Sequence, residues 1–123
     1  MNQEINTLKE AFDHQELDLN NLPDISGFPE KFQKPLMAFF KLMVLNAAVH
    51  DNKPKDWNDI NQWKYEPWFK LSSSGSGFSY LDYGYDGTHS GVGSRLTYLR
   101  KEHMKELLEN EEILEVYKDF MIE

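Results

Sequence analysis

The stretch PLMAFFKLMVLNAAV, residues 35–49, decides the fold of this chain. Within it only Lys41 and Asn46 are polar, so a helix here is apolar on almost every side and belongs in the interior. At about 15 residues it is shorter than the roughly 20 that span a bilayer. Pro35 suits a first helical turn, because its fixed φ matches a helix and its missing N–H has no partner there. We therefore predict a buried central helix and no membrane span.

The sequence before this helix predicts helix, loop and a second short helix. Apolar residues recur at helical spacing within residues 3–14, which predicts a short amphipathic helix. Residues 20–27 are rich in asparagine, proline, serine and glycine and predict an ordered loop. Pro29 and Glu30 suit the first turn of a small helix, which Pro35 is expected to interrupt or kink.

Beyond the central helix the apolar period changes from helical to alternating. Residues 67–71, 78–83 and 94–99 each predict a strand, and the glycine-rich segments 72–77 and 84–91 separate them. Loops this short favour an antiparallel meander, because parallel strands need a crossover of a dozen or more residues. Alternation within the second strand places Phe78, Tyr80 and Asp82 on one face and Ser79, Leu81 and Tyr83 on the other.

The segment WNDINQWKYEPWF, residues 57–69, contains all three tryptophans of the chain. Such a density of rings either closes a small core or forms a binding surface, since aromatic side chains dominate the energetics of both. Packing against the central helix is the favoured interpretation, and an exposed recognition patch is the alternative. Trp68 and Phe69 point to opposite faces in a strand, so one of them faces away from the core. Pro67 places this strand at a sheet edge, or begins it.

The C-terminal region predicts helix again. Apolar stripes run through residues 104–108 and 113–121, and Asn110 lies between them, where a left-handed residue breaks a helix. The outer face is acidic, which favours a solvated surface and leaves a basic partner as the alternative. The predicted fold is a single α+β domain, 1–123, with a buried central helix packed on a three-stranded antiparallel β-meander and N-terminal and C-terminal helices completing the cover.

Composition narrows the function classes. The chain has no cysteine, which excludes disulfides, thiolate zinc sites and cysteine nucleophiles. Residues 1–29 hold six acidic residues and one lysine, residues 30–101 seven acidic and ten basic residues, and residues 102–123 eight acidic residues and two lysines. Acidic ends argue against a general nucleic-acid coat, whereas the basic middle could contact phosphate locally. The start lacks the features of a signal peptide, so we expect a cytoplasmic protein.

No pattern of catalytic, cofactor-binding or metal-ligating residues stands out. The histidines, His14, His50, His89 and His103, lack the spacing of a metal pair. His89 lies in a polar loop, but a catalytic base also needs a nucleophile and an orienting carboxylate within reach. Residues 72–77 are glycine-rich without the pattern of a phosphate-binding loop. We expect no enzymatic activity, no cofactor and no metal.

Several short motifs occur in one order along nearly the whole chain. They are LPDISGFPE (22–30), AFFKLMVLNAA (38–48), PKDW (54–57), KYEPWF (64–69), SGSGFSY (74–80), VGSRLTY (92–98) and EVYKDF (115–120). This set, with the patterns LPDxSxxPE, PxDW, YxPWF and VGSRL, resembles a family of small phage and prophage proteins of Bacteroidetes that has no assigned activity. The resemblance implies a phage accessory gene product that acts inside a host bacterial cell, and it transfers no functional residue.

Together these features favour a non-enzymatic interaction protein that binds and modulates a host machine, with an anti-CRISPR-like inhibitor of a defence nuclease as the sharpest version. Its partner would be a host protein or ribonucleoprotein. The alternative is an accessory protein that binds RNA or single-stranded DNA, with bases stacked on sheet aromatics and phosphates held by lysines and arginines. The residues we predict for the recognition surface are Tyr83, Tyr85, His89, Arg95 and Arg100. The sequence predicts no oligomeric state.

Overall fold

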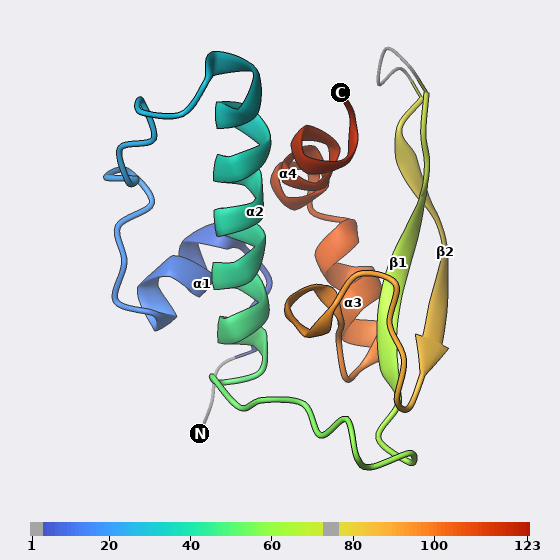
Figure 1. Cartoon of the computed structure of the whole chain (residues 1–123). Helices are drawn as coiled ribbons and strands as arrows, with labels where there is room; N and C mark the ends of the chain where they lie inside the picture. The colour runs from blue at the N-terminus through green and yellow to red at the C-terminus, as the bar shows by residue number, and fades with distance from the viewer. Residues whose placement is uncertain (1–3, 73–76) are drawn as a thin grey trace.

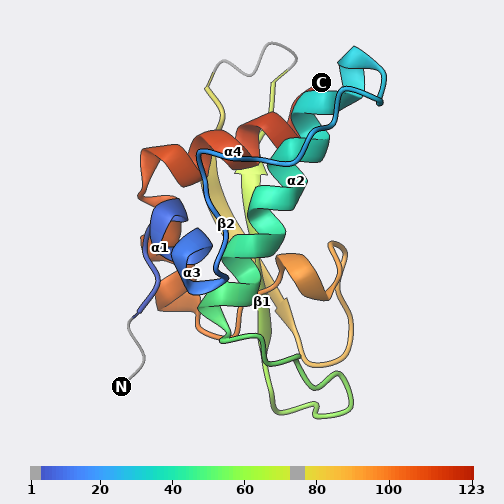
Figure 2. The ribbon, with the colours of Figure 1, turned by 90° about the vertical axis from the view of Figure 1, so that its left-hand side faces the viewer.

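A computed structural model describes residues 4–72 and 77–123 and has an α+β architecture. The predicted helix start at residue 3 and most of the predicted loop 72–77 lie outside the described residues. Helices α1 and α2 form one layer, α3 and α4 lie beside them, and a β-hairpin forms the outermost layer (Figures 1 and 2). In chain order the elements are α1 (Leu8–His14), α2 (Glu30–Val49), β1 (Lys64–Lys70), β2 (Ser79–Asp86), the 3₁₀ helix η1 (Ser94–Leu96), α3 (Lys101–Leu108) and α4 (Glu111–Met121).

Helix α2 is the predicted central helix, and its Leu42 and Leu45 are completely buried. It contacts α1 on one side and α4 on the other. The helix begins at Glu30 and runs through Pro35 without a break, so the expected interruption at Pro35 is wrong. Because Pro35 has no N–H, the carbonyl of Lys31 lacks its usual hydrogen-bond donor within the helix. Lys31 lies in the exposed first turn, where water can donate to this carbonyl.

Side chains cap the ends of two other helices. Thr7 precedes α1, and its Oγ1 accepts a hydrogen bond of 3.1 Å from the backbone N–H of Glu10. This cap makes the N-terminal helix begin at Leu8, later than predicted. The break between α3 and α4 lies at Asn110, as expected. Its cause differs from the predicted one, because Asn110 is extended (φ −76°, ψ 118°) and its Oδ1 accepts from the N–H of Ile113 at 3.1 Å. Asn110 therefore acts as an N-cap rather than as a left-handed residue.

The predicted three-stranded meander is not confirmed, because the sheet in the described part of the chain has two antiparallel strands, β1 and β2. Residues 94–99 follow Gly93, whose φ of +81° turns the chain into η1. Only Tyr98 pairs with β1, through an isolated bridge in which the N–H groups of Tyr65 and Tyr98 donate to each other's carbonyl at 2.7 and 2.8 Å. The segment packs between α2 and β1, so its three consecutive residues 96–98 are all buried and the alternation of a strand is lost.

A β-bulge changes which side chains face the core. Trp68 pairs with Asp82 and Phe69 with Tyr80, so Leu81 is an extra residue in β2. Tyr83 consequently lies half-buried on the core side, while Asp82 is exposed. The alternation predicted for the second strand is therefore wrong from Asp82 onward.

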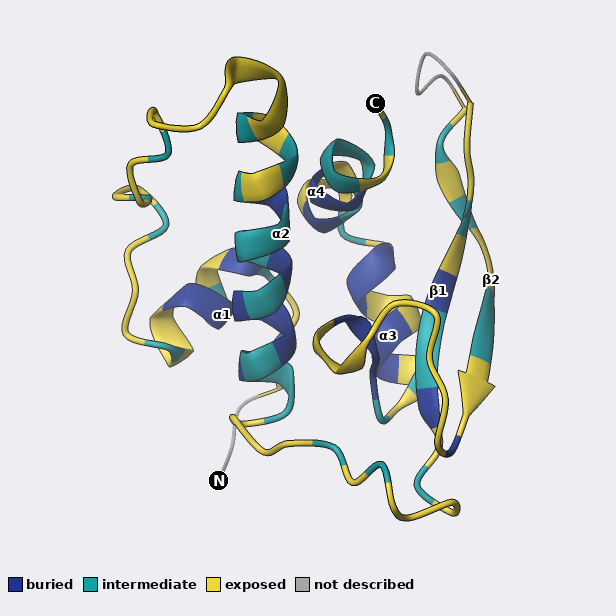
Figure 3. Ribbon diagram, in the orientation of Figure 1, coloured by how far each residue is buried: buried dark blue, intermediate teal, exposed yellow. Residues whose placement is uncertain are grey.

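Most buried polar side chains of the core are paired, although the buried hydroxyl of Tyr80 has no hydrogen-bond partner among the described residues. Asn46 of α2 donates from Nδ2 to the Thr97 carbonyl at 2.7 Å, and its Oδ1 accepts from the Lys55 ammonium at 2.6 Å. The hydroxyls of Tyr98 and Tyr117 share a hydrogen bond of 2.6 Å, and burial raises the pKa of Tyr98 to about 12. Buried residues gather where the four helices face one another, and the long loop before α2 is mostly exposed (Figure 3). The hydrogen bonds from Asn46 to Thr97 and between Tyr98 and Tyr117 attach the segment after η1 to α2 and α4.

Candidate functional site

The hairpin has an inner face that packs on the helices. The Phe69 ring lies 4.9 Å from the Phe78 ring and 5.0 Å from the ring of Tyr117 on α4. This inner face consists of Tyr65, Phe69, Phe78, Tyr80 and Tyr83, all partly buried against the core. Of the aromatic residues in 57–69, Tyr65 and Phe69 therefore pack against the core.

The opposite, outer face of the hairpin is open, because all the helices lie on its other side (Figure 1). It consists of Glu66, Trp68, Asp82 and Gly84. Trp68 is 53% exposed, so the expectation that either Trp68 or Phe69 faces away from the core is confirmed. The indole lies across Gly84, where a Cβ would be 2.9 Å from Trp68 Cζ2. Glycine at this position lets the ring lie along the sheet instead of standing away from it.

Beside Trp68 is a concave site of about 260 Å³, which we call the outer cavity. Its wall includes Glu66 and Trp68 of β1 together with residues 89–91 of the loop after β2. The hydroxyl of Ser90 donates to Glu66 Oε2 at 3.1 Å and attaches the loop to the sheet. Asp86 Oδ1 accepts from the backbone N–H of Thr88 at 2.8 Å and of His89 at 3.1 Å, and these bonds lower the pKa of Asp86. The cavity thus carries one ionised carboxylate in its loop and a second carboxylate, Glu66, on its sheet.

Lys64 lies at one end of the outer face but is buried. Its ammonium donates to the backbone carbonyls of Asp56, Asp59 and Gly87, the last at 2.6 Å, and sits 5.0 Å from the Trp57 ring. Three carbonyl acceptors match the three protons of an ammonium group. Lys64 therefore fastens the loop before β1 to the end of β2, and its charge is not offered to a ligand.

A second group of aromatics, with Trp63 and Tyr85 exposed and Tyr83 half-buried, lies near the start of α3. Trp63 and Tyr85 meet edge to face with centroids 5.2 Å apart, and Tyr85 lies 6.1 Å from Tyr83. The ammonium groups of Lys101 and Lys105 lie 5.5 and 5.1 Å from the Tyr83 ring. A hydrogen bond of 3.4 Å to the Tyr83 hydroxyl raises the pKa of Lys101. We call these five residues the tyrosine cluster, which combines stacking surfaces with cations.

The five residues predicted for recognition do not form one surface. Tyr83 and Tyr85 come together in the tyrosine cluster, and Tyr85 also lines the outer cavity together with His89. Arg95 is exposed on η1. Arg100 lies elsewhere, where its Nη1 is 3.3 Å from Glu4 Oε1.

The geometry of His89 does not make it a catalytic base of the relay type. Its Nδ1 faces both Thr88 Oγ1 at 2.8 Å and Asp86 Oδ1 at 3.4 Å. A relay needs the nucleophile and the orienting carboxylate on different ring nitrogens, and here both lie at the same one. The side chain is also 86% exposed, so water reaches it freely.

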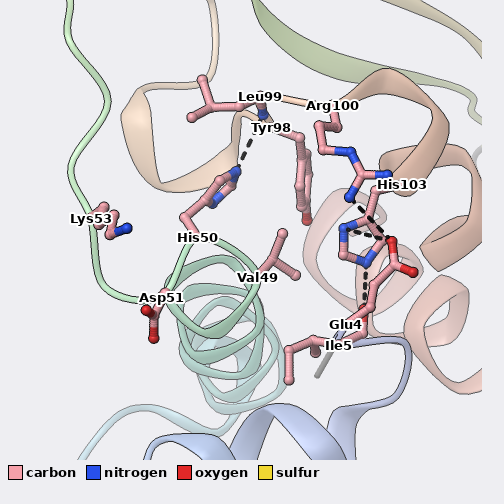
Figure 4. Close-up of a pocket in the computed structure, with 10 residues that line it drawn as sticks. All are labelled: Glu4, Ile5, Val49, His50, Asp51, Lys53, Tyr98, Leu99, Arg100 and His103. Carbon is pink, nitrogen blue, oxygen red and sulfur yellow. Dashed lines mark hydrogen bonds and ion pairs between the residues drawn. The ribbon is translucent and has the colours of Figure 1, made fainter. Parts of the chain in front are cut away.

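The cavity drawn in Figure 4, of about 370 Å³, lies between the end of α2 and the start of α3. His50 Nδ1 bonds to the Asn46 carbonyl at 2.8 Å, and its Nε2 accepts from the N–H of Leu99 at 3.2 Å. This arrangement requires the neutral ring, and burial lowers the pKa of His50 to about 4. His103 bonds through Nε2 to the carbonyl of Ile5. Both histidines join segments of the fold, which is a structural role.

The residues predicted for recognition did not include Trp68 or Glu66, although either Trp68 or Phe69 was expected to face away from the core. The alternation of a strand was the usable signal, since it places both on the face opposite Phe69. Nothing in the sequence indicated that Ser90 would bond to Glu66 across 24 positions.

Within residues 4–72 and 77–123, no three histidine or acidic side chains come together to hold a metal ion. None of the described helices is long and apolar enough to cross a membrane. Comparisons with known protein families, with curated proteins and with solved structures find no match.

Proposed function

We propose that this chain is a phage-encoded, non-enzymatic interaction protein that binds a host machine and inhibits it in an anti-CRISPR-like manner. The observation that carries the proposal is the location of its exposed apolar side chains. Seven of the twelve exposed large hydrophobic residues in the described chain lie between residues 60 and 92. They are Ile60, Trp63, Trp68, Leu71, Leu81, Tyr85 and Val92. An apolar concentration of this kind on a polar protein is typical of an interaction surface.

The charge of the molecule favours a basic partner. Six glutamates of α3, α4 and the turn between them are exposed, and none forms an ion pair with another described residue. They are Glu102, Glu106, Glu109, Glu111, Glu112 and Glu115. Proteins that hold nucleic acid present basic surfaces, which an acidic protein can approach quickly through long-range attraction. This supports a nucleic-acid-guided nuclease as the target.

Binding through the face of the hairpin fits better than binding along its edges. Pro67 has no N–H to offer at the edge of β1, and the N–H of Tyr83 is taken by Asp82 Oδ1 at 2.9 Å. Because neither edge position offers a free N–H, a strand from a partner is less able to pair with the hairpin at these edges. The outer face therefore supplies the contact surface that this proposal requires.

A plaque assay in a Bacteroidetes host tests the proposal. Phage are plated on isogenic hosts with and without an RNA-guided defence system, each expressing the wild-type chain or Trp68→Ala. We expect the wild-type chain to restore plaques only where the defence is present and Trp68→Ala to restore fewer. Equal plaquing with and without the chain, across the defence systems of the host, would refute an inhibitory role. A tagged pull-down after nuclease treatment then identifies the bound protein.

A second candidate function rests on the tyrosine cluster. Rings of Trp63, Tyr83 and Tyr85 beside Lys101 and Lys105 could stack bases and contact phosphates of single-stranded RNA or DNA. A fluorescence titration with a 15-nucleotide oligothymidine at low salt tests this candidate. A response lost in Tyr85→Ala and weakened by salt would support it. A tryptophan signal unchanged at low salt would exclude it.

A further inference from the structure

We infer that the outer cavity accepts an arginine side chain presented by the partner protein. This inference rests on the proposed function and names the chemistry that the partner must display. The half-exposed indole of Trp68 and the carboxylate of Glu66 both line this cavity, whose volume is about 260 Å³. An aromatic face and a carboxylate together are what a guanidinium group binds.

The charges around the cavity favour a cation. Glu66 forms no ion pair with any described residue, and only its Oε2 is engaged, by the Ser90 hydroxyl at 3.1 Å. Asp86, the last residue of β2, contributes a second carboxylate, which accepts from the backbone N–H groups of residues 88 and 89 and lies 3.4 Å from His89 Nδ1. The nearest lysine, Lys64, already donates to three carbonyls. Glu66 Oε1 is therefore an acceptor that a ligand can use.

The shape of the site favours arginine over lysine. The Trp68 indole lies along the sheet, held across Gly84, so it offers a fixed flat surface. A planar guanidinium can stack on this surface while its edge donates to a neighbouring carboxylate. A lysine ammonium is more strongly hydrated and has no plane to stack. Asp82, directly opposite Trp68 in the sheet, adds a further acidic group to the outer face.

The position of the cavity also fits a protein partner. Leu81, the bulge residue one position before Asp82, and Val92, one position after Gly91 of the cavity wall, are exposed and can bury against a partner once an arginine is seated. A central anchor surrounded by contacts that exclude water is typical of a binding hot spot, and arginine is one of the residues enriched there. The arginine would come from the basic surface that the acidic helices attract.

A titration followed by amide NMR tests the inference with the full chain. The probes are N-acetyl-arginine-N-methylamide, its lysine analogue and its citrulline analogue, which keeps the shape of arginine without the charge. We expect saturable shifts of the Trp68 indole N–H and of the Gly84 and Ser90 amides with arginine, and affinity lower by about tenfold for citrulline. Equal affinity for citrulline or for lysine, or shifts confined to other regions, would overturn the assignment.

Two variants sharpen the test. Glu66→Gln keeps an acceptor for the Ser90 hydroxyl and removes the charge, so arginine affinity should fall by about fivefold. Leu81→Ala removes an exposed side chain outside the cavity and should leave that affinity unchanged. Unchanged affinity in Glu66→Gln contradicts the inference.

The outcomes separate this inference from the proposed function. If arginine does not bind but Trp68→Ala still lowers plaque recovery, the arginine assignment fails and the inhibitory role stands. If arginine binds with the expected pattern but the chain never restores plaques, the cavity is correct and the inhibitory role fails.

Discussion

The two faces of the hairpin carry the same kind of side chain in opposite circumstances. Phe69 and Trp68 are neighbours in β1, yet the Phe69 ring packs between Phe78 and Tyr117 while the indole of Trp68 is half-exposed over Gly84. On the inner face the aromatic groups hold the sheet to α4. On the outer face an aromatic group lies beside Glu66, which forms no ion pair with another described residue. Aromatic side chains thus stabilise the fold on the inner face, whereas on the outer face an aromatic ring stays available to bind a partner.

The largest effect should come from the inner face. Phe69→Ala removes a ring that contacts the core, and we expect a loss of about 3 kcal/mol in the free energy of unfolding, because the cavity left behind cannot close fully. Urea unfolding followed by circular dichroism measures the change. A loss below about 1 kcal/mol would show that the inner face does not hold the hairpin.

Strand alternation places Lys64 on the outer side of the hairpin, yet its side chain is buried. A substitution here tests whether burial or the face of the sheet decides the change in the free energy of unfolding. Lys64→Met leaves three carbonyls without their donor, and we expect a loss of about 2 to 3 kcal/mol in unfolding free energy. Lys70→Met is the matched control, since Lys70 is exposed on the same strand. The same urea series should show little change for this control.

Two histidines extend the comparison to pH. The folded-state pKa of His50, about 4, lies below its ordinary value, so between these values the unfolded state binds more protons and stability falls as pH falls. From pH 7 to 5 the loss from this group should be about 1 to 2 kcal/mol, allowing for its partial exposure. Urea unfolding at both pH values measures it. His50→Gln should remove most of this dependence and His89→Asn, on the exposed loop, should keep it.

The smallest effect on stability should come from the outer face. Trp68→Ala removes a half-exposed ring, and we expect unfolding free energy to change by less than about 1 kcal/mol. The same variant should lose partner binding in the nuclease-treated pull-down. A large loss of stability together with retained binding would reverse the roles assigned to the two faces.

The sequence predicted the helical part of the fold well because apolar periodicity is a local signal. It predicted the central helix and the break at Asn110, although it placed the start of α2 at Pro35 instead of Glu30. A proline near an exposed helix end costs a single hydrogen bond, which the buried face of α2 outweighs. Helix propensity alone could not show that burial of the α2 face outweighs the hydrogen bond lost at Pro35.

The third strand and the site depended on contacts that are distant in sequence. Residues 94–99 alternate like a strand, but burial between α2 and β1 selects a 3₁₀ turn and a single bridge at Tyr98. The bulge at Leu81 likewise reverses the facing of Asp82 and Tyr83. The aromatic nature of the proposed recognition surface was predictable, and strand alternation places Trp68 and Glu66 on one face. The hydrogen bond from Ser90 to Glu66 was not predictable, because it joins residues 24 positions apart.

The buried ammonium of Lys64 acts on its loop as a bound calcium ion acts on many long loops, by gathering carbonyl oxygens around one positive charge. Here the cation is covalently part of the chain. The geometry of this loop should therefore be the same in chelating buffers and in buffers rich in divalent ions. It should instead be sensitive to reagents that acylate amines, although burial will make Lys64 one of the last lysines to react.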